Sequence, residues 1–587
     1  MKKSIIYFLI LTGIFSSCKK VLDLEDINSY SPDQVWSDPN LANAYVANLY
    51  SVFGNWDVGS DRRSDQLAGI LFPNNAITIT SAAYSGWDYT SIRLINQAIV
   101  DVGAGNLPPA TKDEVVAQSL FLRAYAYFLM VRAYGGVPYL TVPQDRLADS
   151  LEIPRNTTAE CFQLMIKDLD DAIALLPRRI IPTAANWGRI DRTFAQAFKA
   201  KILLYKASPQ FNPANAWNNI NWVEAYTANK IAYDSLRSAG FTLVENYSDI
   251  AIAEKNSEIV FPVINQFPNK VSVWDHGARP GSVSRGNASA CPTWEFVKAY
   301  PMLDGKAYND PTGVYYKTDA QFLQAYWKDR DPRFEKSILW NAKLYPVAGK
   351  VAGYRQYTSI GIADALDNYG LNAKSADRSA NNDRYTGFFI LKNCKLSLAQ
   401  PEVQKYDVDY PLMRFAEVML NYAEAANETG HSMEAIDILR QIRKRAGITP
   451  DTDNNYGMKV GSREEIRTTI MNERNIELAF EGFRFWDLRR WRMLSILHNK
   501  TKNGVEAIAI QPDGTDMPLT QAKAAAANNQ LKEENFKYSV LQAPQAGEKL
   551  NILPDTYYFF PIPQSIMARN KKLVQNKDWG GAFTPTL

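Results

Sequence analysis

Cysteine and histidine are scarce in this sequence of 587 residues, which has four of the first and three of the second. Three cysteines lie beyond residue 18, so at most one disulfide can form, which excludes a disulfide scaffold. The sequence has no HExxH, His-x-Glu or CxxC spacing, so we expect no transition-metal site and no cofactor. The residues concerned are Cys161, Cys291, Cys394, His276, His431 and His498.

An excess of charge of one sign is also lacking. The chain has 65 basic and 62 acidic residues, a formal net charge of +3, and no long block of lysine or arginine. Binding of nucleic acid needs clustered basic residues, so we expect no such partner. Beyond the N-terminal segment no stretch approaches 18 uninterrupted apolar residues, and we expect a soluble, globular body.

The N-terminal segment has the three parts of a bacterial secretion signal. Two lysines precede the apolar residues 4–15, and two serines then precede Cys18. A bilayer-spanning helix takes about 20 apolar residues, so this run is too short to span. We expect residues 1–17 to be a lipoprotein signal peptide, Cys18 to carry the lipid, and residues 18–37 to form a lipidated tether. The alternative is an ordinary cleaved signal followed by an incidental cysteine.

Residues 38–256 show mainly helical patterns and form the expected N-terminal helical region. Asp38 and Pro39 supply a helix cap and a proline at the first helical position. Leu41, Tyr45 and Leu49 then recur at helical spacing. Further helices are predicted over residues 91–100, 112–134, 158–176, 193–207 and 222–238.

Residues 257–587 form the expected C-terminal region, packed with the first as one body. Loops rich in Gly, Asn, Ser and Pro fill residues 257–400, with β-prone runs at 258–263 and 387–392. Helical periodicity returns at 409–429 and 433–446, a pair that resembles a tetratricopeptide hairpin. Ser462 and Glu465 form a capping box that predicts a further helix start. No strict 34-residue repeat runs through the chain, so a pure solenoid is not predicted.

Several segments share one resemblance. Residues 473–491 read ERNIELAFEGFRFWDLRRW, and residues 560–564 read FPIPQ. The N-terminal half has FLRAY at 121–125 and YGGVP at 134–138, and RDPR follows at 330–333. In this order these segments resemble the SusD/RagB family of outer-membrane, nutrient-binding lipoproteins. The resemblance extends over nearly the whole chain beyond the signal.

The resemblance implies a mainly α fold with four embedded tetratricopeptide-like helix pairs and an irregular, loop-rich portion with short strands. It also implies a lipid anchor on Cys18 in the outer membrane, with the protein facing the cell exterior. The implied partner is a TonB-dependent SusC-like barrel transporter, over which such proteins sit as a lid and deliver oligosaccharide or polysaccharide. Catalysis is not implied.

A second interpretation of residues 473–491 is enzymatic. Glu473, Glu477 and Glu481 share a helix face, as the paired carboxylates of a glycosidase or of a carboxylate metal site would. Four further residues each lie three positions from an opposite charge, as in helix ion pairs: Arg474, Arg484, Asp487 and Arg490. No histidine is near, so we interpret the segment as structural.

The sequence motifs of other enzyme classes are absent. The YGGVP segment lacks the Gly-Lys-Ser/Thr ending of a phosphate loop, and no Gly-x-Ser-x-Gly elbow occurs. We therefore expect that the protein is not an enzyme.

Three polar loops carry the chemistry that sugar binding needs, which is a flat apolar ring beside groups that bond hydroxyls. Burial of each tryptophan against a helix is the alternative, and His276 alone could be a satisfied loop residue. The predicted ligand-binding residues are Trp56, Asp57, Arg62, Arg63 and Asp65 in the first loop, Trp87 and Asp88 in the second, and Trp274, His276 and Arg279 in the third.

The sequence thus predicts a non-enzymatic surface lipoprotein that captures a glycan by weak stacking and hydrogen bonds and releases it to an importer. A peptide- or protein-binding member of the same family is one alternative, and a surface glycoside hydrolase is another. Which glycan is bound depends on loop geometry rather than on residue inventory.

Overall fold

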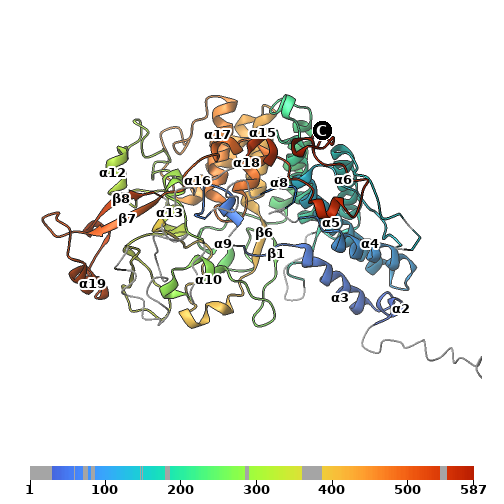
Figure 1. Cartoon of the computed structure of the whole chain (residues 1–587), viewed down its shortest axis with the longest axis horizontal. Helices are drawn as coiled ribbons and strands as arrows, with labels where there is room; N and C mark the ends of the chain where they lie inside the picture. Colours follow the sequence, from blue (N-terminus) through green and yellow to red (C-terminus); the bar gives the residue numbers. More distant parts are fainter. Residues whose placement is uncertain are drawn as a thin grey trace, which may run out of the picture.

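The computed structural model describes residues 30–57, 60–69, 77–80, 86–145, 147–148, 150–178, 186–284, 290–359, 362, 386–542 and 552–587. The expected signal peptide, Cys18 and the start of the tether therefore lie outside the described residues. Helices gather at one end and along the top of the molecule, and loops with short strands fill the other end (Figure 1).

The N-terminal region is helical, as predicted. Asp38 caps α3 through hydrogen bonds from the Asn40 and Leu41 amides, and Thr157 and Glu160 form a capping box on α6. The observed helices include the predicted ones, whose ends differ from the prediction by four residues or fewer, and two short helices, α2 and α9, that were not predicted. They are α2 (Pro32–Val35), α3 (Pro39–Leu49), α4 (Tyr89–Ala104), α5 (Pro109–Tyr134), α6 (Thr158–Leu175), α7 (Arg192–Ala207), α8 (Asn221–Ser238) and α9 (Asp249–Ile252).

Successive helices pack against one another: α4 with α5, α5 with α6, and α7 with α8. α5 is long and apolar enough to cross a membrane by composition alone, but 83% of its most apolar window is buried inside the protein. It is thus the central core helix of this end of the molecule.

The C-terminal helices pack onto the N-terminal ones, since α15 contacts α8 as well as α16 and α17. Ser462 and Glu465 form the predicted capping box at the start of α17. The helices of this part are α15 (Phe415–Glu428), α16 (Ser432–Ala446), α17 (Arg463–Glu477) and α18 (Arg484–Arg490).

The predicted helix over residues 409–429 is wrong at its start. Residues Tyr410–Arg414 form strand β6, which pairs antiparallel with β1 (Ile259–Val263). The partner strand lies about 150 residues earlier in the chain, so local periodicity could not reveal this pairing. The strand predicted at 258–263 is confirmed as β1.

The remaining elements are short and belong to the predicted loop-rich portion. Three more antiparallel pairs form there: β2 (Ile338–Leu339) with β5 (Phe389–Ile390), β3 (Lys343–Leu344) with β4 (Arg355–Gln356), and β7 (Gly504–Ala509) with β8 (Phe536–Leu541). Its helices are α10 (Trp274–Ala278), α11 (Trp294–Ala299), α12 (Asp319–Leu323), α13 (Pro332–Ser337) and α19 (Leu519–Ala527), followed towards the C-terminus by α20 (Pro554–Tyr557) and α21 (Gln564–Met567).

Two large hydrophobic cores organise the described residues. The first joins the N-terminal helices to α15–α18 and so draws on both sides of the boundary expected at residues 256 and 257. The second lies in the loop-rich portion and includes Trp56, Trp274 and Phe480. Tyr410 packs against both cores and marks the seam between them. Cys161, Cys291 and Cys394 are buried, and no disulfide joins them.

Candidate functional site

The turn after α17 forms one wall of the seam. Phe480 adopts a left-handed backbone conformation with φ 61°, which costs about 1–3 kcal/mol for a non-glycine residue. Its amide donates a hydrogen bond of 3.3 Å to the side chain of Gln66, and the Gly482 amide donates one of 3.2 Å to Asp61. The first predicted loop is thereby attached to the turn, although about 400 residues separate them.

A hollow of about 280 Å³ opens at this seam, and we call it the seam hollow. One face of α5 lines it with Tyr125, Phe128, Leu129 and Arg132, which recur at helical spacing. The other lining residues come from α7, β6, α10, α18, the first loop and the turn after α17. They include Phe198, Lys201, Tyr205, Tyr410, Trp274, Trp56, Asp57, Arg63, Phe480, Glu481, Phe483 and Trp486.

Two of the predicted platforms meet in this hollow but are not displayed outward. Trp56 is 6% exposed and Trp274 is 1% exposed, with ring centroids 4.7 Å apart. The Trp56 indole donates to the Val408 carbonyl at 2.9 Å, and the Trp274 indole donates to the Lys392 carbonyl at 3.2 Å. Each indole N–H is satisfied by backbone, so the polar surroundings of these residues did not mean exposure. Of the alternatives left open by the sequence, burial therefore holds for both tryptophans.

Charged residues line the same hollow. Asp57 is exposed and Arg63 is half-buried, and both come from the first predicted loop. Lys201 of α7 makes an ion pair of 2.8 Å with buried Glu417 and lies 5.0 Å from the Phe483 ring centroid. Arg132 of α5 lies over the Trp486 ring, with its guanidinium carbon 3.9 Å from the centroid. Rings and hydrogen-bonding groups are thus combined, as in many ligand sites.

Other predicted residues of the first and third loops make contacts within the protein. Asp65 makes a bidentate pair with Arg484 at 2.9 Å. The backbone carbonyl of Arg62 accepts a hydrogen bond from Lys502 at 2.7 Å, and the role of the Arg62 side chain in binding stays a prediction. Arg279 is fully buried, pairs with Asp275 and donates to the Leu398 carbonyl at 2.8 Å. The expectation that Arg279 faces a ligand is therefore wrong, because its donors are used inside the protein. Half-buried His276 lies 3.3 Å from the Ser284 hydroxyl.

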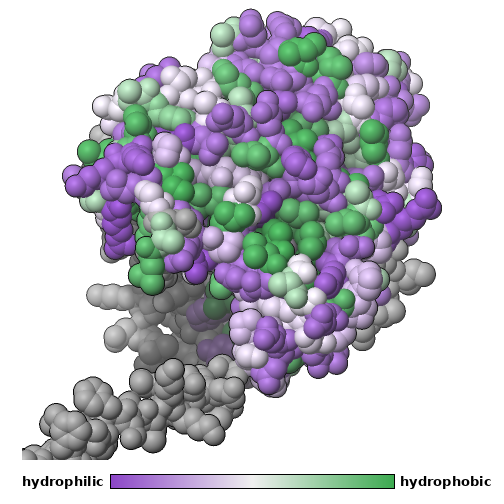
Figure 2. All heavy atoms as spheres, turned by 90° about the vertical axis from the view of Figure 1, so that its right-hand side faces the viewer, coloured by the Kyte–Doolittle hydropathy of each residue, from purple (hydrophilic) through white to green (hydrophobic). Residues whose placement is uncertain are grey.

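Trp87 lies in a different place, in a second hollow of about 590 Å³. Its ring is partly exposed and contacts Tyr89 and Tyr134. Asp88 caps α4 by accepting hydrogen bonds from the Thr90 and Ser91 amides, and its role in ligand binding stays a prediction. This hollow belongs to the helical end, and the face at that end shows apolar groups gathered near its centre (Figure 2).

Several polar groups of the second hollow are already engaged within the protein. Asn96 donates to the Leu140 carbonyl at 2.9 Å and accepts from Arg123 at 2.9 Å. Arg93 donates to the Gln144 carbonyl at 2.5 Å, and Asn570 donates to the Ile153 carbonyl at 2.8 Å. These donors are used by the backbone, so we favour the seam hollow as the candidate site.

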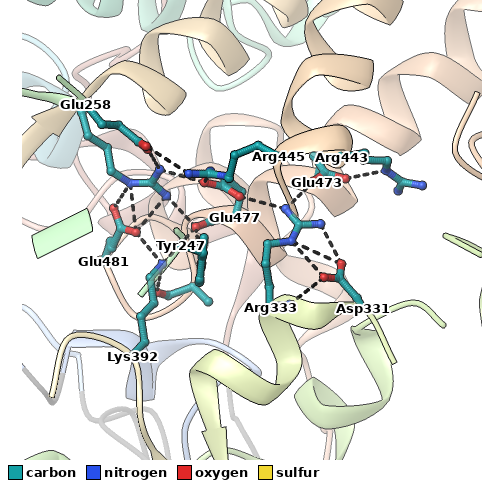
Figure 3. Close-up of polar contacts among 12 residues, drawn as sticks. Tyr247, Glu258, Asp331, Arg333, Lys392, Arg443, Arg445, Glu473, Glu477 and Glu481 are labelled. Carbon is teal, nitrogen blue, oxygen red and sulfur yellow. Dashed lines mark hydrogen bonds and ion pairs between the residues drawn. The ribbon is translucent and has the colours of Figure 1, made fainter. Parts of the chain in front are cut away.

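Glu473 and Glu477 of α17 and Glu481 of the turn after it lie in a buried ion network (Figure 3). The helix ends at Glu477, so the prediction that all three share a helix face is wrong for Glu481. Each of the three glutamates is bound by two or three cations, and the nearest ion pairs measure 2.5–2.9 Å. Five cations balance five carboxylates. They are Arg333, Lys392, Arg414, Arg443 and Arg445 on one side and Glu258, Asp331, Glu473, Glu477 and Glu481 on the other.

The structural interpretation of this segment holds, but its pairs differ from those predicted. Among the pairs three residues apart, Arg490 and Asp487 are 2.8 Å apart as expected. Arg474 instead bonds Asp487 at 2.9 Å, 13 residues away, and Arg484 bonds Asp65. The glutamates are bound by residues from β6, α13 and α16, which a helix-based count of spacings could not find.

The pKa values reflect these surroundings. Burial alone would raise the pKa of Glu477, but Arg445, Arg414 and Arg333 lower it well below its usual range. Burial raises the pKa of Asp61 to about 7, and the nearby carboxylates Asp57 and Glu481 act in the same direction. Among the described residues no group of three His, Cys, Asp or Glu side chains could hold a metal ion.

Sequence reasoning missed several residues of the seam hollow. Phe483 and Trp486 lie in the segment that carries the resemblance, and Arg132 and Lys201 lie on helices interpreted only as frame. One sequence signal could have identified them. Aromatic residues recur at helical spacing on α5 and α7, and Arg132 and Lys201 occupy the same helix faces nearer the surface.

Comparison with known proteins identifies the family of this fold and hollow. The family model described as "SusD family" matches residues 262–579. The chain belongs to the SusD family. A second model, described as "Starch-binding associating with outer membrane", matches residues 36–204.

Individual SusD-family proteins resemble the chain over most of their length. The SusD-like protein P38 of Formosa agariphila is 25% identical over 513 residues, covering 83% of this chain and 90% of that protein. A SusD-like crystal structure from Bacteroides fragilis superposes with a TM-score of 0.70 at 22% identity, covering 93% and 98%. A SusD-like carbohydrate binding protein from the same species gives 0.69 at 22% identity, covering 92% and 99%. These likenesses confirm the mainly α SusD fold.

Proposed function

We propose that this protein is a lipoprotein of the outer-membrane surface that binds an oligosaccharide or polysaccharide and delivers it to a TonB-dependent SusC-like transporter. The observation that carries the proposal is the seam hollow, in which aromatic rings surround a space rimmed by Asp57, Arg63, Arg132 and Lys201. Family membership and the similar carbohydrate binding protein of Bacteroides fragilis support it.

A non-catalytic role fits the carboxylates of the site. Glu481 is the glutamate of the α17 segment that lines the hollow, and Arg414 and Lys392 bind it at 2.6–3.1 Å. These cations lower its pKa, although burial alone would raise it. A general acid needs a carboxyl that stays protonated near neutral pH, and Glu481 is held in the opposite state. We therefore infer capture and release without bond cleavage.

Isothermal titration calorimetry on the purified protein, guided by a glycan array, tests the binding role. Phe483→Leu removes a flat ring from the hollow while keeping apolar volume, so we expect affinity to fall about tenfold, the loss of just over 1 kcal/mol typical of an interface anchor. Tyr316→Leu is the matched control, because this 49% exposed ring is not among the residues that line the hollow. Equal affinities of both variants would refute the choice of hollow. Release of reducing ends would instead favour the hydrolase, and binding of peptides without any glycan would favour the peptide-binding alternative.

Two further measurements test the anchor and the partner. Cys18→Ala should move the protein from the outer-membrane fraction to the soluble fraction and abolish labelling by palmitate, whereas Cys161→Ser should leave both unchanged because Cys161 is buried. Affinity purification from solubilised outer membranes should recover a TonB-dependent barrel. Membrane retention of the Cys18 variant, or recovery of no barrel, would contradict these parts of the proposal.

A further inference from the structure

Arg132 combines an unusual set of features within the seam hollow. It lies in the last turn of α5, and its guanidinium carbon is 3.9 Å from the Trp486 ring centroid and 5.6 Å from that of Phe128. Stacking on a ring fixes the plane of a guanidinium and leaves its N–H edge available for hydrogen bonds. The side chain is half-buried and lines the hollow.

No group in the described part of the chain bonds this guanidinium. Its Nε is buried without a hydrogen-bond partner, and no described carboxylate makes an ion pair with it. Two other charged residues of the hollow differ from Arg132, since Lys201 is paired with Glu417, and Glu481 is paired with Arg414 and Lys392. Contact with the Trp486 face uses only the π-surface of the guanidinium, so packing alone leaves its donors unused.

We propose that the seam hollow accepts an acidic sugar and that Arg132 binds its carboxylate or sulfate. This inference rests on the proposed glycan-binding function and names the substrate class. A guanidinium presents two parallel N–H groups that match the two oxygens of such an anion, and this bidentate contact is among the stronger hydrogen-bond geometries. The aromatic walls then contact the C–H face of the same sugar ring.

Calorimetry with three defined probes distinguishes the ligand classes: an oligogalacturonate for the carboxylate, a sulfated carrageenan oligosaccharide for the sulfate, and maltoheptaose as a neutral glycan. We expect one acidic probe to bind and Arg132→Gln to weaken it about tenfold or more, the effect of losing a charged hydrogen bond. Arg132→Lys should give an intermediate loss, because it keeps the charge without the fork. Wild-type affinity should fall with added NaCl, and this salt dependence should largely disappear in Arg132→Gln.

The matched control is Arg492→Gln. Arg492 lies 4.1 Å from the Tyr558 ring centroid but is not among the residues that line the seam hollow, so its loss should leave affinity unchanged. Thermal melts of all variants show whether each is folded. If Arg132→Gln has a strongly lowered melting temperature, the affinity of Arg132→Lys still tests the contact. Stronger binding of maltoheptaose than of either acidic probe, or unchanged acidic binding in folded Arg132→Gln, would overturn the inference alone. Failure of every glycan to bind would overturn the proposed function itself.

Discussion

Replacing Glu477 with Gln removes the most heavily bound carboxylate of the buried network. One oxygen of Glu477 accepts hydrogen bonds from Arg414 at 2.8 Å and from Arg445, and the other accepts from Arg333 at 2.9 Å. The side chain is fully buried, and the substitution keeps its size. It changes a cluster of five positive and five negative groups into one with a net charge of +1.

The expected cost is about 3–5 kcal/mol of unfolding free energy, because breaking a buried ion pair leaves uncompensated charge. The new amide also presents N–H groups to guanidinium groups that can only donate. The matched control is Glu464→Gln in the exposed first turn of the same helix, which should cost less than about 1 kcal/mol.

The assay is urea unfolding followed by tryptophan fluorescence at neutral pH and in acid. The guanidinium groups lower the pKa of Glu477 below its value near 4.3 in the unfolded chain, so the unfolded state binds more protons in acid. The stabilisation is therefore complete above about pH 5 and is lost as pH falls through the lowered pKa. The gap between wild type and Glu477→Gln should narrow over that range. A neutral-pH difference below about 1 kcal/mol, or a gap that does not depend on pH, would refute this reasoning.

Two further substitutions test local features. Burial raises the pKa of Asp61 to about 7, so the folded wild type keeps a proton that the unfolded chain loses above about pH 4. The unfolding free energy of the wild type should therefore fall between about pH 4 and pH 7 relative to that of Asp61→Asn. Urea-unfolding free energies of the two proteins that change with pH in the same way would contradict this. Gly136→Ala would place Cβ 2.1 Å from the Asn156 carbonyl oxygen and should destabilise by at least about 1–3 kcal/mol, whereas Gly103→Ala in α4 meets nothing within 4 Å and should stabilise by about 0.5–1 kcal/mol. A higher melting temperature for Gly136→Ala than for Gly103→Ala would contradict this account of the space around the two glycines.

The helices of this fold were predictable because their signals are local. Asp38 with Pro39 and Ser462 with Glu465 act within a few residues of the helix they start, and both caps form as predicted. Strand β6 was not predictable in this way, since its apolar residues also fit a helical stripe. Only its pairing with β1 decides between the two structures.

The candidate site was predictable only in part, for a related reason. Trp56, Asp57, Arg63 and Trp274 do converge on one hollow, although Trp56 and Trp274 are buried. Polar neighbours in the sequence did not predict exposure, because backbone carbonyls more than 100 residues away satisfy both indoles. Arg279 was misjudged in the same way.

The buried network and the seam hollow are two sides of one turn. Lys392 donates hydrogen bonds to the carbonyl oxygens of Glu477 and Ala479 and makes an ion pair with Glu481, so the chain is held on both sides of Phe480. This restraint helps keep Phe480 in its strained left-handed conformation and positions the aromatic wall before any ligand arrives. Because the ion network already orders the aromatic wall, ligand binding does not have to supply the free energy of ordering it. A few weak contacts then suffice to bind the ligand, and the ligand can still dissociate. If the seam hollow binds the glycan as proposed, the glutamates that look catalytic in the sequence serve binding indirectly, by fixing the shape of the hollow.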